Sequence, residues 1–116
     1  MSEQVIEVGE KMHIITRRLF EGDARRHFVG EVTRVSGELQ EVRGYTFVFN
    51  RGTNEFKKRP DLRTRIFSLG QAGLIVNKIP REVTLESLEY RLIDKRLVVT
   101  DSRDFALDIN EFGHLA

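Results

Sequence analysis

A basic segment near the middle of the sequence is the strongest candidate for chemistry with an anionic partner. Five Lys or Arg residues occur within residues 57–65, around Pro60, and only Asp61 opposes them. Arg43 and Arg51 precede this segment. Aromatic residues lie beside these bases in the sequence: Tyr45, Phe47, Phe49 and Phe56. Single-stranded nucleic acid is bound by a positively charged groove with aromatic side chains on which bases stack. The predicted anion or nucleic-acid site comprises Arg43, Arg51, Lys57, Lys58, Arg59, Arg63 and Arg65.

Composition favours a more ordinary interpretation of the same residues. The net charge is +1 and the pI is about 8.1, whereas dedicated nucleic-acid-binding domains have a pI above roughly 9. The charge is uneven along the chain, at −3 for residues 1–10, +6 for residues 11–65 and −2 for residues 66–116. Bases in such a segment often form the solvated outer face of strands, and aromatic residues prefer the core.

Two arginine pairs form a second basic group. Arg17 and Arg18 precede the turn expected near residues 21–24, and Arg25 and Arg26 follow it. Bases on either side of a hairpin turn can clamp a phosphate or carboxylate. They can equally form ion pairs with the acidic residues of the turn, each contributing at most about 1 kcal/mol when exposed. Ion pairing within the turn is the favoured interpretation.

The histidines and the absence of cysteine predict no metal or cofactor site. His13, His27 and His114 show none of the short spacings that are typical of metal ligands. His13 and His27 fall on neighbouring predicted strands, but the sequence does not place them in contact. The chain has no Cys, which excludes disulfides and thiolate ligands and fits a reducing compartment.

Acidic and nucleophilic residues do not define a catalytic site. Asp101, Asp104, Asp108 and Glu111 are close in sequence, but a paired-carboxylate enzyme needs two carboxylates that meet in space. The first two belong to an expected turn, in which aspartate bonds its own backbone. GxSxG, GxGxxG and P-loop patterns are missing, and residues 70–73 indicate a strand reversal. These residues therefore favour a non-enzymatic protein, with a paired-carboxylate hydrolase as the open alternative.

The stretch Val42–Phe49 is the strand around which the other elements are arranged. It is rich in aromatic and β-branched residues and ends in a turn cluster at residues 50–54. A three-residue connection, Ser36-Gly37-Glu38, pairs it with the preceding strand. The resulting register joins Val32 to Val42, Val29 to Tyr45, Glu31 to Arg43 and Gly30 to Gly44. Apolar residues then face apolar residues and opposite charges face each other.

Short segments of strand composition, separated by turns, fill the rest of the chain. They are residues 11–20, 25–35, 55–59, 63–69, 74–79, 89–93, 96–100 and 105–109. Residues 84–88 can form one short helical turn. The pattern predicts an all-β fold, a small antiparallel β-barrel or sandwich of about eight short strands. We expect a flexible N-terminal arm at residues 1–10, a single β domain at residues 11–112 and a frayed tail at residues 113–116.

Three functions fit this fold, and the first is favoured. It is a non-enzymatic binding or assembly domain, cytoplasmic and homo-oligomeric, since the apolar content of residues 42–49 and 96–109 is high for one small barrel. The alternatives are single-stranded nucleic-acid binding through residues 43–65 and a small-ligand pocket inside the barrel. We expect no membrane partner, because no apolar run reaches the length of a membrane span.

Overall fold

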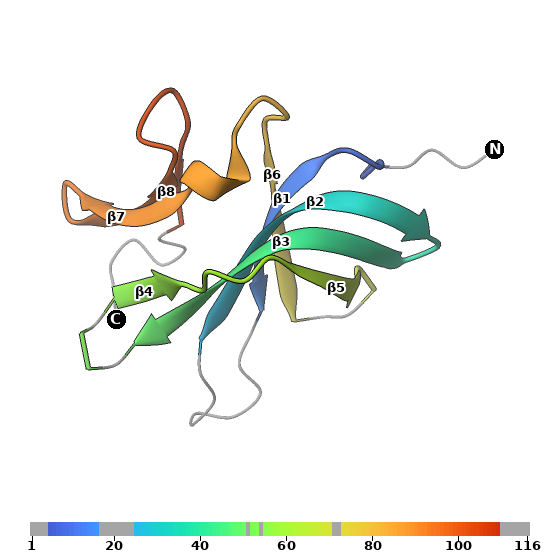
Figure 1. Cartoon of the computed structure of the whole chain (residues 1–116), viewed down its shortest axis with the longest axis horizontal. Coiled ribbons are helices and arrows are strands. Elements are labelled where there is room, and N and C mark those ends of the chain that lie inside the picture. Colours follow the sequence, from blue (N-terminus) through green and yellow to red (C-terminus); the bar gives the residue numbers. More distant parts are fainter. Residues whose placement is uncertain (1–4, 17–24, 51, 54, 71–72, 110–116) are drawn as a thin grey trace. The chain divides into compact units, whose positions relative to one another are not determined.

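The computed structural model describes residues 5–16, 25–50, 52–53, 55–70 and 73–109. They form nine β-strands and one 3-10 turn, so the predicted all-β antiparallel fold is confirmed (Figure 1). The chain divides into two compact units, Met1–Arg81 and Glu82–Ala116, and each unit contains one antiparallel sheet.

The first unit holds a six-stranded sheet. Its strands are β1 (Lys11–Thr16), β2 (Arg26–Ser36), β3 (Leu39–Asn50), β4 (Glu55–Lys58), β5 (Arg63–Ser68) and β6 (Leu74–Ile79). The order is β4-β3-β2-β1-β6, and β5 also pairs with β3. Within the described residues β5 pairs only with β3 and β6 only with β1, so the sheet does not close. Of the predicted barrel or sandwich, the described residues form no closed barrel; they form two antiparallel sheets, one in each unit.

The predicted register of the β2–β3 hairpin is confirmed. All four predicted pairs are present: Val32–Val42, Val29–Tyr45, Glu31–Arg43 and Gly30–Gly44. The connection is one residue shorter than predicted, because Ser36 pairs with Leu39 across a two-residue turn. Gly37 has φ +58°, the sign that the first central position of a type II′ turn requires. A β-bulge at Thr33 compensates for the missing residue and restores the predicted pairing beyond it.

Side-chain alternation gives the first sheet two distinct faces. One face, here called the cluster face, carries a buried apolar cluster: Met12, Ile14, Phe28, Val32 and Val42. Partly buried residues from β5 and β6 pack against this cluster: Phe67, Leu74 and Val76. The opposite face, here called the histidine face, carries buried His13, His27, Val29 and Phe47.

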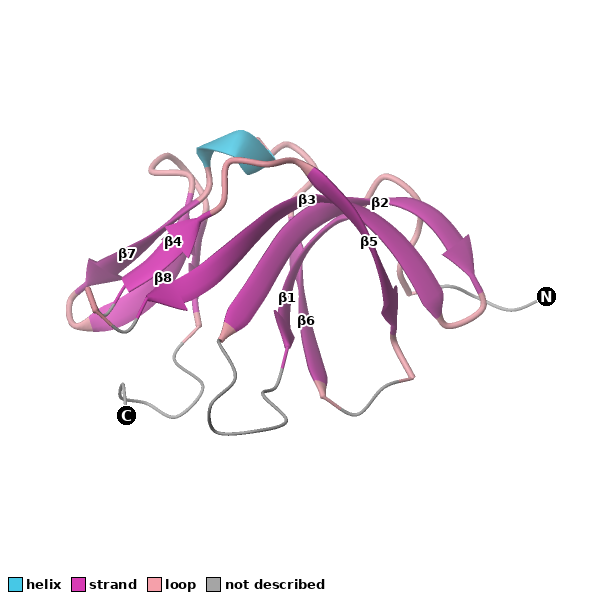
Figure 2. Ribbon diagram, turned by 60° about the horizontal axis from the view of Figure 1, so that its bottom comes forward, coloured by secondary structure: helices cyan, strands magenta, loops and turns pink. Residues whose placement is uncertain are grey.

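Gly30 and Gly44 face each other where β2 and β3 come unusually close. A Cβ atom on Gly44 would overlap the carbonyl oxygen of Val29 and lie 2.5 Å from the Cα atom of Gly30. Both strands bend along their length in this sheet (Figure 2). Facing glycines allow such an approach because neither residue has a side chain to accommodate.

Two successive strands share the outer edge of β3. β4 pairs with one end of β3 through Phe47–Asn50, and β5 pairs with the other end through Leu39–Gly44. Pro60 lies between β4 and β5, where it ends the first of them because proline cannot donate to the ladder. The two short strands therefore continue one another along the same edge.

Residues 5–10, predicted to belong to a flexible arm, contact the first sheet. The amide of Gly9 donates to the Val32 carbonyl at 2.8 Å, and the amide of Val32 donates to the Glu10 carbonyl at the same distance. Lys78 Nζ donates to the Val5 carbonyl at 2.6 Å and forms an ion pair with Glu10 at 3.0 Å. Ile6 packs against the apolar cluster. The described part of the arm thus contributes to the core.

The second unit holds a three-stranded meander. A 3-10 turn, η1 (Leu85–Ser87), falls within the predicted helical segment at residues 84–88. It is followed by β7 (Glu89–Ile93), β8 (Arg96–Thr100) and β9 (Ala106–Asp108). Asp94 and Lys95, between β7 and β8, both have positive φ, at 51° and 66°. That is the backbone of a type I′ hairpin turn.

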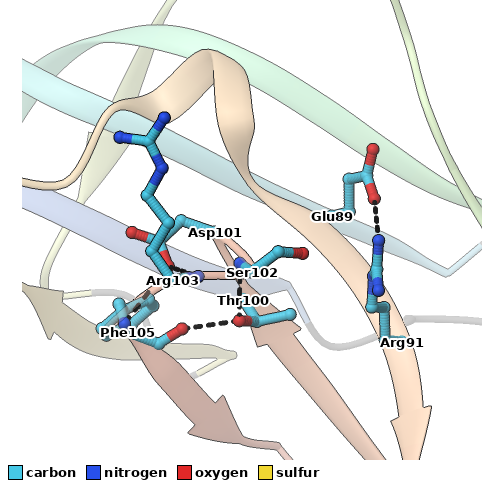
Figure 3. A network of polar contacts seen from close by, with 7 residues as sticks. All are labelled: Glu89, Arg91, Thr100, Asp101, Ser102, Arg103 and Phe105. Atoms are coloured by element: carbon cyan, nitrogen blue, oxygen red, sulfur yellow. Dashed lines mark hydrogen bonds and ion pairs between the residues drawn. The ribbon is translucent and has the colours of Figure 1, made fainter.

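A polar network orders the turn between β8 and β9 (Figure 3). Asp101 Oδ1 accepts hydrogen bonds from the amides of Arg103 and Phe105, at 2.8 and 3.2 Å. The Thr100 hydroxyl donates to the Phe105 carbonyl at 2.6 Å and accepts from the Ser102 amide at 2.9 Å. Asp101 therefore bonds its own turn, as predicted from the sequence.

Candidate functional site

The predicted basic site is divided between the two faces of the first sheet. Residues opposite each other in a ladder share a face. Lys57 pairs with Val48 on the cluster face, and Lys58 pairs with Phe47 on the histidine face. Arg63 and Arg65 oppose Gly44 and Val42 on the cluster face, whereas Arg43 lies on the histidine face. Arg59 is exposed just after β4, and Arg51 lies outside the described residues. Bases adjacent in sequence thus point in opposite directions.

Lys58 lies over two aromatic rings of β3. Its Nζ atom is 4.5 Å from the ring centroid of Tyr45 and 5.8 Å from that of Phe47. These are cation–π distances, and each such contact contributes about 0.5–1 kcal/mol at an exposed site. Lys58 is therefore partly engaged within the sheet, whereas Lys57 is exposed on the other face.

The aromatic residues beside the predicted basic site differ in how far they are covered. Phe47 is only 1% exposed. The rings of Phe49 and Phe56 meet edge to face at 5.2 Å, and Phe56 stacks on His27 at 4.5 Å. Aromatic side chains used to stack nucleic-acid bases need an open ring face. Phe47 and the face of Phe56 that stacks on His27 are therefore covered, whereas Tyr45 and Phe49 are partly exposed.

The second basic group is described only in part. Arg25 lies over the Phe49 ring, with its guanidinium carbon 5.5 Å from the centroid, and Arg26 is exposed. The pair at residues 17–18 and the acidic residues of the turn, at positions 21 and 23, lie outside the described residues. The clamp and the alternative ion pairs both stay predictions.

His13 and His27, which the sequence could not bring together, meet on the histidine face. Their rings are in edge contact, with centroids 5.4 Å apart. Burial lowers the pKa of His13 to about 4. Burial, with the charges of His13 and Arg25, lowers the pKa of His27 to about 3. Asn77 Nδ2 lies 3.4 Å from His13 Nδ1. These rings are thus neutral in the folded protein near neutral pH.

The potential metal ligands and carboxylates do not converge where the structure describes them. No group of three His, Cys, Asp or Glu side chains with metal-binding geometry occurs among these residues. Asp101 bonds its turn, and Asp108 forms an ion pair with Arg96 at 2.7 Å. Glu111 and His114 lie outside the described residues. Of the acidic group predicted from the sequence, Asp101 is therefore engaged in a turn, Asp108 in a surface ion pair, and Asp104 is exposed.

The cluster face holds two buried oxygen atoms without a hydrogen-bond partner in the described structure. They are Gln40 Oε1 and Thr46 Oγ1, both on β3. Six residues along a strand correspond to about 20 Å. The bend of β3 shortens this distance (Figure 2), but the two side chains are still six residues apart on one strand and not side by side. This separation weakens the small-ligand alternative, because a ligand site needs polar groups that converge.

The exposed edge of β5 is the feature that sequence reasoning missed. Within the described part of the chain, β5 pairs on one side only, with β3. Ile66, near its middle, is 67% exposed, and Leu62, just before the strand, is 46% exposed. Leu39, on the neighbouring strand, is 47% exposed. A short strand that follows Pro60 and carries Arg63 and Arg65 has a composition compatible with an edge strand, but which of its sides is unpaired depends on the pairing of the whole sheet.

Comparisons with known proteins add no functional information. No protein-family model, no curated protein and no solved structure matches the chain significantly. Among the described residues, no helix is long and apolar enough to cross a membrane. Function must therefore be argued from the surfaces of the molecule.

Proposed function

We propose that the protein is a non-enzymatic binding and assembly domain that adds a strand from another chain to the outer edge of β5. The observation that carries the proposal is the combination of a largely exposed Ile66 with a strand that, among the described residues, pairs on one side only. An edge strand presents a row of backbone donors and acceptors that can pair with an added strand. Alternate side chains then supply specificity.

Ile66 and Leu39 together form an exposed apolar surface beside this edge. Ile66 opposes Glu41, and Leu39 opposes Ser68, so Ile66 and Leu39 lie diagonally on the histidine face. Diagonal neighbours in a sheet are within reach of long side chains. An added strand could therefore cover Ile66 while its backbone pairs with β5. Burying the exposed part of an aliphatic side chain contributes about 1–2 kcal/mol.

The source of the added strand can be a second copy of the chain. In an antiparallel pairing centred on Ile66, each Ile66 would face its symmetry mate, and Thr64 would face Ser68 of the second copy. A two-fold pairing of this kind is self-complementary and closes as a dimer. It would produce the homo-oligomer that the sequence predicts. A different protein with an extended segment is the other source.

Replacing Ile66 with lysine should weaken strand addition without disturbing the fold. The probe is a labelled peptide in which threonine and valine alternate, long enough to pair with all of β5. We expect binding that protects β5 amides from hydrogen exchange, and about tenfold weaker binding to Ile66→Lys, because one apolar contact is lost. Leu92→Lys, at a site 66% exposed in the second unit, is the matched control. Equal binding by both variants would contradict the use of this edge.

Single-stranded nucleic-acid binding through residues 43–65 is the second candidate. It is favoured by the exposure of Lys57, Arg59, Arg63 and Arg65. Replacing Lys57, Lys58 and Arg59 with alanine should then weaken oligonucleotide binding and flatten its salt dependence, because fewer counterions are released. Fluorescence anisotropy at two salt concentrations measures both quantities. An oligonucleotide that does not bind even at low salt would remove this candidate.

A further inference from the structure

We infer that the edge of β5 selects an extended segment in which acidic and apolar residues alternate. This inference rests on the proposed strand addition and names the chemistry of the partner. It follows from which side chains β5 presents on each face, as the register with β3 defines them. The two faces of this edge favour different side chains on the incoming strand.

The cluster face of this edge is basic. Arg63 and Arg65 oppose Gly44 and Val42, and both arginines are exposed. Lys57 lies on the same face one strand earlier, opposite Val48. A strand beside β5 would place alternate residues opposite the two arginines, where carboxylates contribute about 0.2–1 kcal/mol each. Arginine also binds carboxylates in a bidentate geometry that lysine cannot reproduce.

One existing ion pair does not oppose this arrangement. Arg63 contacts Asp61 at 3.5 Å, and the two side chains are 48% and 61% exposed. An ion pair this exposed contributes about 0–1 kcal/mol. A partner carboxylate could therefore replace Asp61 at little cost.

The histidine face of the same edge is apolar at the matching position. Ile66 is 67% exposed there, with Leu39 diagonal to it. Residues of the incoming strand that alternate with the carboxylates would point to this face. An apolar side chain at that position would cover Ile66. The required pattern is thus acidic toward Arg63 and Arg65, and apolar toward Ile66.

A second copy of the chain fits the cluster face less well. Pairing centred on Ile66 would place Arg65 opposite Phe67 of the second copy. The two Arg65 side chains would then lie diagonal to each other. Pairing centred on Arg65 would place the two Arg65 side chains directly opposite each other. Like charges in these positions destabilise a sheet. Charge complementarity therefore favours an acidic partner over self-pairing.

A charge-swap experiment tests the inference directly. The probes are two labelled peptides, one with alternating glutamate and valine and one with alternating lysine and valine, measured by anisotropy with the intact protein. We expect the glutamate peptide to bind at least about tenfold more tightly than the lysine peptide. The Arg63→Glu, Arg65→Glu double variant should reverse that preference. Arg103→Glu, in an exposed turn of the second unit, should leave the preference unchanged.

Each outcome separates the inference from the proposed function. Reversal of the preference by the double variant supports the inference, since a merely structural role of the arginines would not create lysine selectivity. If the glutamate peptide, the lysine peptide and the uncharged threonine–valine peptide all bind equally well, the inference is overturned and strand addition still holds. Self-association in sedimentation that depends on Ile66, without peptide selectivity, would overturn it in favour of a second copy. If no peptide binds and the protein is monomeric, both proposals fall.

Discussion

Replacing Gly44 with alanine is expected to lower the free energy of unfolding by about 3 kcal/mol or more, at the upper end of overpacking effects. The added Cβ would overlap the Val29 carbonyl oxygen and lie 2.8 Å from the Val29 carbonyl carbon. These are backbone atoms of the paired strand, so no side-chain rotation relieves the clash. Domains of this size have a total stability of about 5–15 kcal/mol. Denaturant unfolding followed by circular dichroism measures the loss.

Gly37→Ala is the matched control for Gly44→Ala. Gly37 has φ +58°, and a Cβ atom there would meet nothing within 4 Å. Its replacement should cost only the strain of a left-handed conformation, about 1–2 kcal/mol. A smaller loss for Gly44→Ala than for Gly37→Ala would show that close strand approach is not required at the bend.

Acidification below pH 6.5 is expected to destabilise the fold through His13 and His27. Both histidines have an unfolded pKa of 6.5 and a lower folded pKa, about 4 for His13 and about 3 for His27. The unfolded state therefore binds more protons as the pH falls, and stability present above pH 6.5 is lost toward the folded values. The slope is about 1.4 kcal/mol per pH unit for each histidine. By about pH 5 the combined loss approaches roughly 4 kcal/mol.

His27→Phe separates the histidine contribution from that of other groups. Phenylalanine keeps a ring against Phe56, where His27 now stacks at 4.5 Å, and cannot be protonated. The free energy of unfolding of this variant should vary about half as steeply between pH 6.5 and about 5. Hydrogen bonds to Glu7 and Lys78 lower the pKa of Glu10. Protonation of Glu10 therefore changes the free energy of unfolding only below its ordinary pKa of 4.5. An unchanged slope in His27→Phe would contradict the assignment.

Much of the fold could be predicted because strand composition and turn residues agree along this chain. The β2–β3 register was predicted from a three-residue connection and supported by the match of Val32 with Val42 and Gly30 with Gly44; the structure confirms both pairs, although the connection has two residues. The bulge at Thr33 could not be predicted, because no local pattern marks it; in the structure the Thr33 hydroxyl contacts the Glu41 backbone and side chain, at 3.1 and 2.9 Å. Nor could the sequence show that two short strands share one edge of β3.

The candidate site was less predictable because nearness in sequence is not nearness on a face. Lys57 and Lys58 are consecutive, yet strand alternation sends them to opposite faces. His13 and His27 meet because Ile15 pairs with His27, which requires the β1–β2 register rather than any local motif. The exposed edge of β5 depends on which strands pair, and that is a property of the whole sheet.

The pairing of β1 with β6 has a consequence for how the chain acquires its structure. Lys11 pairs with Ile79, so this part of the ladder forms only after nearly all of the first unit is available. The β2–β3 hairpin, by contrast, joins neighbours across a two-residue turn. Loop-closure entropy delays distant contacts relative to local ones. On the ribosome, the hairpin can therefore form early, while β1 keeps one edge open until β6 emerges.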